Sequence, residues 1–340
     1  MVTISQDPFY NLMIGVAAIF VLVFVADKLI EKTIRVSKKL GISQIFIGLT
    51  VIAMGTSLPE ITTSIVASLD IVRGNIDPFI ASGTVLGTSI GSDIVQQTLI
   101  MGIIGVLAVI MLKPIRVKKE FLKEDGLVLI AAAFLLLLFC IDGTLSRVEG
   151  AVMFFGYMIF LWFLWIREDE DIHNQHRRVE LKGTDKKSIF IDLIIIVVGI
   201  VIVIFSAEFI LRVAEFFVIG YGIGGSLIGI MVIGVATALP ELTTSITALL
   251  RGASSISVGT LIGSNITNPM FALGLGAMIS SYQVPRPVLI YDIPVKILTS
   301  FIIIGFLWRK HMFARREAMT MIAIYLVYIL VRLKYFSVDI

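Results

Sequence analysis

Two short segments of the chain combine a proline, a carboxylate and several hydroxyls inside long apolar runs. The first is MGTSLPEITTS at residues 54–64, and the second is VATALPELTTS at residues 235–245. Each segment places a glutamate, Glu60 or Glu241, directly after its proline. An acidic side chain in the middle of an apolar segment is expensive to bury and marks a functional site by default. These two glutamates are therefore the first candidates for binding a cation.

The prolines of these segments, Pro59 and Pro240, predict a break in each helix. Proline has no backbone N–H, and its ring clashes with the carbonyl four residues earlier. We expect the carbonyls of residues 53–57 and 234–238 to lose their helical partners, which lipid tolerates only around a cavity or a bound ion. Each glutamate then begins a new half-helix, whose positive end favours the ionised carboxylate. Freed carbonyls and threonine hydroxyls are hard oxygen ligands that suit Ca²⁺ or Na⁺.

A second pair of similar segments carries hydroxyl and amide side chains. They are GTSIGSDIVQ at residues 87–96 and GTLIGSNITN at residues 259–268. A spacing of four residues puts a serine and an amide on one helix face in each segment. The pairs at this spacing are Ser92 with Gln96 and Ser264 with Asn268. Two other interpretations stay open, because small residues and amides also serve helix packing and interhelical hydrogen bonds in membranes.

The candidate ligands are all oxygen atoms. Two facing carboxylates without a cation would repel each other in a low dielectric, and a divalent cation neutralises the pair. The set contains no histidine or cysteine, which favours Ca²⁺ over Zn²⁺ or Cu⁺. Asp93, next to Ser92, is a third acid with three open interpretations: a direct ligand, a proton-linked group or a salt-bridged residue.

The composition of the chain predicts which secondary-structure elements hold these residues. The 340-residue chain is 57% hydrophobic and 16% charged, and its mean hydropathy is +0.99. A soluble domain cannot bury so much apolar surface, and the runs are too long and lack the alternation of a β-barrel. The single cysteine excludes a disulfide framework. We predict an all-α polytopic membrane protein with ten transmembrane helices, at residues 11–31, 42–70, 79–111, 126–142, 146–166, 188–211, 223–250, 254–281, 287–308 and 316–334.

The segments repeat across the two halves of the chain. The glutamate segments are 181 residues apart, and the serine–amide segments are 172 residues apart. We therefore predict a first five-helix repeat at 1–166, a cytoplasmic linker loop at 167–187 and a second, inverted five-helix repeat at 188–340. The second half is inverted because five is an odd number of crossings. Inverted repeats with interrupted helices in matching places indicate a transporter whose site lies near the bilayer midplane.

The loops after spans 1, 3, 5, 7 and 9 hold 21 of the 28 lysines and arginines. The excess of basic residues faces the cytoplasm in most membrane proteins. We therefore expect both termini to lie outside and the linker to lie in the cytoplasm, with the chain in the cytoplasmic membrane.

At these residues the chain resembles the Ca²⁺/cation antiporter superfamily, most closely its prokaryotic Na⁺/Ca²⁺ exchanger branch. The resemblance rests on GTSLPE, ALPELTTS and the two G-T-x-I-G-S stretches, and it covers both halves. It implies two inverted five-helix repeats, alternating access, and export of Ca²⁺ against an inward Na⁺ gradient. The metal-site residues that it implies are Glu60, Glu241, Gln96, Asn268, Thr56, Ser57, Thr237, Ser92 and Ser264, to which we add Asp93. In one departure from the family pattern, Asn268 stands where some prokaryotic members carry an acid.

Other functions remain to be weighed against this one. An H⁺/Ca²⁺ exchanger of the same fold would use Glu60, Glu241 or Asp93 as the proton carrier. An intramembrane enzyme is disfavoured, because no H-E-x-x-H motif is present and no histidine falls in a predicted span. A channel needs an open pore, which two inverted halves around one occluded site do not provide. We expect no cofactor and, as partners, inorganic cations and the lipid bilayer, without a nucleic-acid or protein partner.

Overall fold

The computed structural model of the protein describes residues 8–40, 42–111, 115, 119–174, 186–218, 225–310 and 315–339. These residues are almost entirely helical. Two short strands, β1 (Thr144–Leu145) and β2 (Tyr282–Gln283), pair antiparallel in the described part of the chain. The predicted all-α polytopic class is confirmed.

The helices fall into two series that match in order, except that the second series has an additional π-helical turn, η5 (Val288–Asp292), before α15. The first series is α1 (Pro8–Leu40), α2 (Gln44–Ile47), η1 (Gly48–Ile52), α3 (Ala53–Thr56), α4 (Leu58–Arg73), α5 (Pro78–Val95), η2 (Gln96–Ile100), α6 (Met101–Ile110), α7 (Lys119–Cys140) and α8 (Arg147–Asn174). The second is α9 (Lys186–Val218), α10 (Gly225–Ile228), η3 (Gly229–Ile233), α11 (Gly234–Thr237), α12 (Leu239–Leu250), α13 (Ser254–Thr267), η4 (Asn268–Leu273), α14 (Gly274–Ser280), η5 (Val288–Asp292), α15 (Ile293–Lys310) and α16 (Arg315–Tyr335). The η elements are π-helical turns, which often mark functional sites in helices.

The two helices that contain Pro59 and Pro240 are bent where the sequence predicts. The axis turns by 44° between Gln44–Thr56 and Leu58–Arg73, and by 40° between Gly229–Thr237 and Leu239–Leu250. The predicted loss of carbonyl partners is wrong in part. The carbonyls of Ala53 and Gly234 still accept from the residues four positions later, at 3.0 and 3.2 Å. A proline removes only its own N–H, so neighbouring turns of the helix keep their bonds.

Each of the ten expected spans falls on one helix, one bent helix or one continuous run of helical elements of the described chain. By length and apolarity, four helices in the described residues are able to cross a membrane, or six if each bent pair counts as one span. The number of crossings therefore stays a prediction. Helix α8 continues to Asn174 and α9 begins at Lys186, so residues 167–174 and 186–187 of the predicted linker 167–187 are helical.

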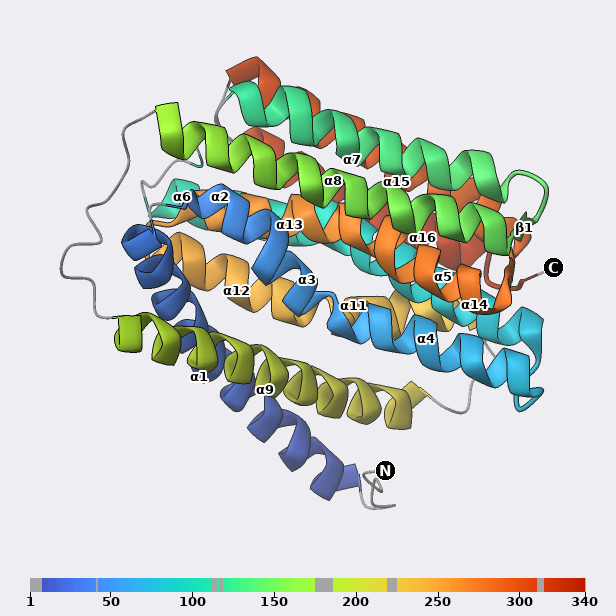
Figure 1. The fold of residues 1–340 in the computed structure, drawn as a ribbon. Helices are drawn as coiled ribbons and strands as arrows, with labels where there is room; N and C mark the ends of the chain where they lie inside the picture. Colours follow the sequence, from blue (N-terminus) through green and yellow to red (C-terminus); the bar gives the residue numbers. More distant parts are fainter. Residues whose placement is uncertain are drawn as a thin grey trace.

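The two halves run through the bundle in opposite directions. In Figure 1, the N- and C-terminal ends lie toward the same end of the bundle, and α8 finishes and α9 begins at the other end. The first half therefore starts at one end of the bundle and finishes at the other, and the second half returns to the first end. This is the arrangement that an odd number of crossings in each half requires.

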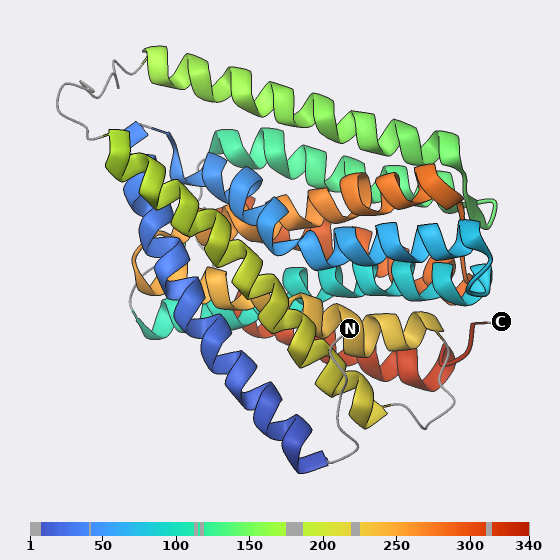
Figure 2. The same cartoon turned by 60° about the horizontal axis from the view of Figure 1, so that its bottom comes forward.

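Helices α1 and α9 form a separate pair at one side of the bundle. They pack against each other along their length and run obliquely to the remaining helices (Figure 2). Three basic side chains of α1 surround one carboxylate of α9: Lys32, Arg35 and Lys39 lie 3.4 to 3.6 Å from the oxygens of Asp192. The other helices form the core that holds the repeated sequence segments of both halves.

That core is interleaved, because each half packs its bent helix against a straight helix of the other half. Helix α5 contacts α10, η3 and α11, and α13 contacts α2, η1 and α3. Glycines allow both crossings. A Cβ atom on Gly91 would lie 2.6 Å from the Cα of Ile230, and one on Gly263 would lie 2.6 Å from the carbonyl oxygen of Leu49. The helix backbones are therefore in direct contact at both crossings, and the site between the crossings is bordered by closely packed helices.

In each half, a carboxylate near the end of the half binds a serine at the start of the bent helix, and we call these two contacts carboxylate clamps. Glu168 lies in α8, and Asp339 follows α16. Near the start of α2, the backbone N and hydroxyl of Ser43 donate to the two oxygens of Glu168 at 2.5 and 2.6 Å. In α10, the backbone N of Ser226 donates to Asp339 at 2.8 Å, and its hydroxyl donates to the other oxygen of Asp339. A carboxylate at a helix start satisfies free N–H groups and the helix dipole together.

Candidate cation site

The two glutamates predicted to bind a cation lie at the centre of the interleaved core. Glu60 and Glu241 each occupy the first turn of the half-helix that follows a bend, α4 and α12. Their exposed fractions are 1% and 0%. The two carboxyls lie close enough to repel each other, and among the residues that the structure describes neither has a basic interaction partner. Two buried like charges without a counter-charge require a bound cation or protons to be stable.

Hydroxyl groups from both halves surround the carboxyls. Ser92 of α5 donates to Glu60 Oε1 at 2.8 Å. Thr237 of the second half also lies beside Glu60, whereas Thr56 of the first half and Ser264 lie beside Glu241. Each carboxyl is thus flanked by a threonine from the opposite bent helix, as the inverted repeat predicts. The site is built jointly by the two halves.

Several predicted ligands present oxygen atoms that are buried and have no hydrogen-bond partner. These atoms are Ser57 Oγ, Glu60 Oε2, both oxygens of Glu241, Ser264 Oγ and Asn268 Oδ1. An unpartnered polar atom in a dry interior is costly, and a cation that binds several of them removes that cost at once. The donor set is all oxygen with two carboxylates, which matches the coordination preferences of Ca²⁺.

The two threonines of the site keep their acceptor sites available. Thr56 Oγ1 donates to the carbonyl of Ile52 at 2.9 Å, and Thr237 Oγ1 donates to that of Gly234 at 3.4 Å. Each hydroxyl hydrogen is therefore directed to its own helix, and the oxygen lone pairs remain for a cation.

The two amides predicted as ligands differ. Gln96 uses both ends: its Nε2 donates to Ser92 at 3.1 Å, and its Oε1 accepts from Asn265 at 2.9 Å. Asn268 uses only its amino end, which donates to Asp93 at 2.8 Å, and its oxygen is free. In this structure Gln96 therefore serves as an interhelical hydrogen bond, the alternative interpretation, while Asn268 presents a free oxygen.

Of the three roles left open for Asp93, the structure shows an ion pair. Its Oδ1 accepts from Asn268, and its Oδ2 is bonded by Lys296 of α15. Both Asp93 and Lys296 are completely buried. Neither carboxylate oxygen of Asp93 is unpartnered, in contrast to those of Glu241.

Sequence reasoning missed three polar residues that complete this network. Gln97 Nε2 donates to Asn265 and to Ser300, each at 2.9 Å. Lys296 neutralises Asp93, and a signal for it was present, because it is a basic residue inside an apolar segment. Asn265 occupies the repeat position of Asp93, so the repeat itself marked it. All three link the two halves across α5, α13 and α15.

In the described part of the chain, no three side chains among histidine, cysteine, aspartate and glutamate cluster closely enough to hold a metal ion. A cation at this site would therefore rest on the Glu60–Glu241 pair and on neutral oxygens. Such a site carries a formal charge of −2, which one divalent cation or two monovalent cations balance.

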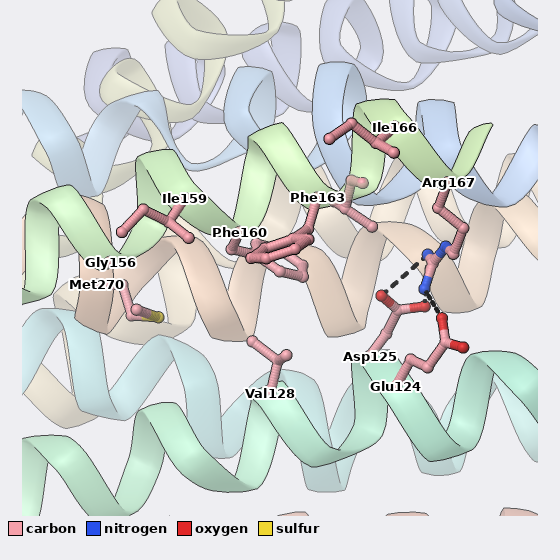
Figure 3. Close-up of a pocket in the computed structure, with 11 residues that line it drawn as sticks. Glu124, Asp125, Val128, Gly156, Ile159, Phe160, Phe163, Ile166, Arg167 and Met270 are labelled. Carbon is pink, nitrogen blue, oxygen red and sulfur yellow. Dashed lines mark hydrogen bonds and ion pairs between the residues drawn. The ribbon is translucent and has the colours of Figure 1, made fainter. Parts of the chain in front are cut away.

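A groove with described lining residues lies elsewhere, between α7 and α8. It has a volume of about 550 Å³ and is lined mainly by apolar side chains such as Ile159, Phe160 and Phe163 (Figure 3). At one end Arg167 faces the carboxylates of Glu124 and Asp125 and forms ion pairs with both. The groove therefore differs from the Glu60–Glu241 site in that its acids have a basic partner.

Comparisons with known proteins find relatives that match most of the chain. The family described as sodium/calcium exchanger protein matches residues 10–166 and 191–334. The sodium/calcium exchanger MaX1 of Methanosarcina acetivorans is 28% identical over 94% of this chain and 98% of its own length. The putative antiporter CaxA of Alkalimonas amylolytica is 32% identical over 78% of this chain and 81% of its own. A crystal form of the exchanger NCX_Mj soaked with Na⁺ and Sr²⁺ superposes with a TM-score of 0.76 at 25% identity, covering 94% of this chain and 97% of that one.

Proposed function

The chain belongs to the sodium/calcium exchanger family, within the Ca²⁺/cation antiporter superfamily, and on this premise we propose that it exchanges Ca²⁺ for Na⁺ across the cytoplasmic membrane. One observation carries the proposal. Glu60 and Glu241, in repeat-related bent helices, are both buried and interact electrostatically; three of their four carboxyl oxygens lack a hydrogen-bond partner, and neither has a basic partner among the described residues. Ca²⁺ and Na⁺ are the transported substrates of the proposed reaction, which needs no cofactor.

Competition between the two ions for the same oxygens couples their fluxes. One Ca²⁺ or two Na⁺ ions neutralise the glutamate pair, so either cargo removes the net charge of the site in the low-dielectric core. An empty site leaves two bare carboxylates in a dry interior. The protein therefore switches between its two open states readily when loaded and poorly when empty, which enforces exchange.

The inverted halves supply the two openings that alternating access requires. A site shared by two repeats of opposite direction has equivalent surroundings on both sides of the membrane, so movement of one group of helices against the other exposes it to each side in turn. The oblique pair α1 and α9 lies beside this core and contacts α12 and α11 respectively. We propose that both termini lie outside and that the junction between α8 and α9 lies in the cytoplasm.

Radioactive calcium flux tests the function. The protein is reconstituted in liposomes loaded with Na⁺, K⁺ or choline at equal ionic strength, and uptake of ⁴⁵Ca²⁺ is followed with and without an imposed pH gradient. We expect uptake only when an outward Na⁺ gradient is present. Uptake driven by the pH gradient alone would establish H⁺/Ca²⁺ exchange instead, and uptake without any counter-ion gradient would establish a channel.

The unpartnered side-chain oxygen of Asn268 should contribute more to cation binding than the hydrogen-bonded oxygen of Gln96. We expect Asn268→Ala to raise the Ca²⁺ concentration for half-maximal thermal stabilisation by about tenfold or more, because one ligand is lost. Gln96→Ala should raise it by about threefold or less, because the Gln96 oxygen is held by Asn265. Melting curves of both purified variants against Ca²⁺ measure this. Equal shifts in the two variants would contradict the assignment.

A further inference from the structure

A buried ion pair lies beside the candidate cation site and takes no part in the function proposed so far. Lys296 of α15 donates to Asp93 of α5, and both side chains have 0% exposure. Asp93 also interacts electrostatically with Glu60. Removing two charges from water is expensive, and a pair of apolar residues of similar volume often stabilises a protein as well or better. Packing alone therefore does not account for this pair.

The second half of the chain shows what the same position does without a charge. Asn265 is the repeat equivalent of Asp93, and its amide donates to Gln96 at 2.9 Å. Asp93 in turn accepts from Asn268, the repeat equivalent of Gln96, at 2.8 Å. The two contacts join equivalent positions, but donor and acceptor are exchanged: Asn265 donates, whereas Asp93 accepts. Since a neutral asparagine makes the contact in one half, the negative charge of Asp93 and its counter-charge on Lys296 are additions to the first half.

The charge on Asp93 fixes the orientation of a proposed ligand. An ionised carboxylate only accepts hydrogen bonds, so the amide of Asn268 must turn its amino group toward Asp93. Its oxygen is then directed away, buried and without a partner. A bare Asp93, however, would be a third carboxylate close to Glu60 and would itself attract a cation. The ammonium of Lys296 removes that attraction.

We propose that the ammonium of Lys296 is a tethered cation: it takes the place that a free cation would otherwise occupy at Asp93. Asp93 therefore orients Asn268 and does not bind a transported ion. The proposal rests on the proposed function for the identity of the cargo, and it adds a determinant of how many ions the site carries. Lys296 acts as a positioning residue, through Asp93 and Asn268. Without its ammonium, Asp93 becomes a site for a monovalent cation from solution.

The response of thermal stability to K⁺ tests this directly. The purified full chain and its Lys296→Met variant are melted in detergent with Ca²⁺ chelated, while KCl replaces choline chloride at constant ionic strength. We expect the melting temperature of Lys296→Met to rise by roughly 5 °C between 1 and 100 mM K⁺, because the ion binds only the folded protein. The wild type and the double variant Asp93→Asn/Lys296→Met should change by about 1 °C or less.

Two results would overturn the proposal: a Lys296→Met variant that responds to K⁺ as the wild type does, or a double variant that responds as strongly as Lys296→Met. If Lys296→Met cannot be purified in any salt, Asp93→Asn replaces it. The unpaired ammonium should then raise the Ca²⁺ midpoint of thermal stabilisation by about tenfold, and adding Lys296→Met should bring it back to within about threefold of wild type. Equal midpoints in these two variants would also reject the tethered cation.

The K⁺ response does not depend on transport. A positive response together with absent Na⁺-driven ⁴⁵Ca²⁺ uptake would retain the tethered cation and reject the proposed exchange. Normal Na⁺-driven uptake together with a Lys296→Met variant that does not respond to K⁺ would retain the proposed exchange and reject the tethered cation.

Discussion

Glu60→Gln and Glu241→Gln should each reduce Na⁺-driven ⁴⁵Ca²⁺ uptake by about 100-fold or more. Each substitution preserves the shape of the side chain but removes one of the two charges that a divalent cation balances, and losing one member of a buried charge interaction costs several kcal/mol. Both carboxyls are buried, and three of their four oxygens lack a hydrogen-bond partner. Initial rates in proteoliposomes measure the effect.

Glu149→Gln is the matched control for these two variants. Glu149 also lies in the first turn of a helix, α8, where it accepts from the backbone N of Ser146 at 2.8 Å. Glutamine serves equally well in such a capping position. Glu149→Gln should therefore transport at close to the wild-type rate. If either site variant transports within about twofold of wild type, the glutamate pair is not the cation site.

Gly91→Ala and Gly263→Ala should lower the melting temperature of the purified protein by roughly 5 °C or more. Each new methyl group would lie 2.6 Å from backbone atoms of the crossing helix, which cannot move aside as a flexible side chain can. Overpacking of this kind typically destabilises by about 1–3 kcal/mol. The two variants should lower the melting temperature by similar amounts, because the two helix crossings occupy equivalent positions in the two repeats.

Gly305→Ala provides the control for these packing variants. Gly305 lies in α15, and a Cβ atom there would meet no atom within 4 Å. Alanine favours a helix by about 1 kcal/mol relative to glycine. Its melting temperature should therefore stay unchanged or rise. A fall for Gly305→Ala as large as that for Gly91→Ala would show that added methyl groups, and not the crossings, determine stability.

The repeated motifs were sufficient to predict the centre of the molecule. A proline followed by a glutamate predicts both the bend and the buried acid, and finding the pattern twice places Glu60 and Glu241 in equivalent positions of opposite direction. Local chemistry determines these features, since a missing N–H and a charge in an apolar run have the same consequence in any membrane helix. The structure confirms the bends at Ser57 and Ala238.

Features that depend on distant partners could not be predicted. Lys296 meets Asp93 across 203 residues of sequence, and no local pattern specifies that contact. The direction of the Gln96 oxygen depends on Asn265, which lies on a helix of the other half. Glu168 belongs to a charged run that is typical of a solvated loop, yet α8 continues through it and brings its carboxylate to Ser43.

The two carboxylate clamps have a consequence for the history of the chain. Ser43 with Glu168 and Ser226 with Asp339 each join residues of a single half, whereas the helix crossings join different halves. A half-length ancestor would thus already have contained the serine–carboxylate contact that joins its two ends. It would have lacked only a second copy to complete the ion site. Two identical copies inserted in opposite orientations would have met that need as a homodimer before gene fusion made the arrangement permanent.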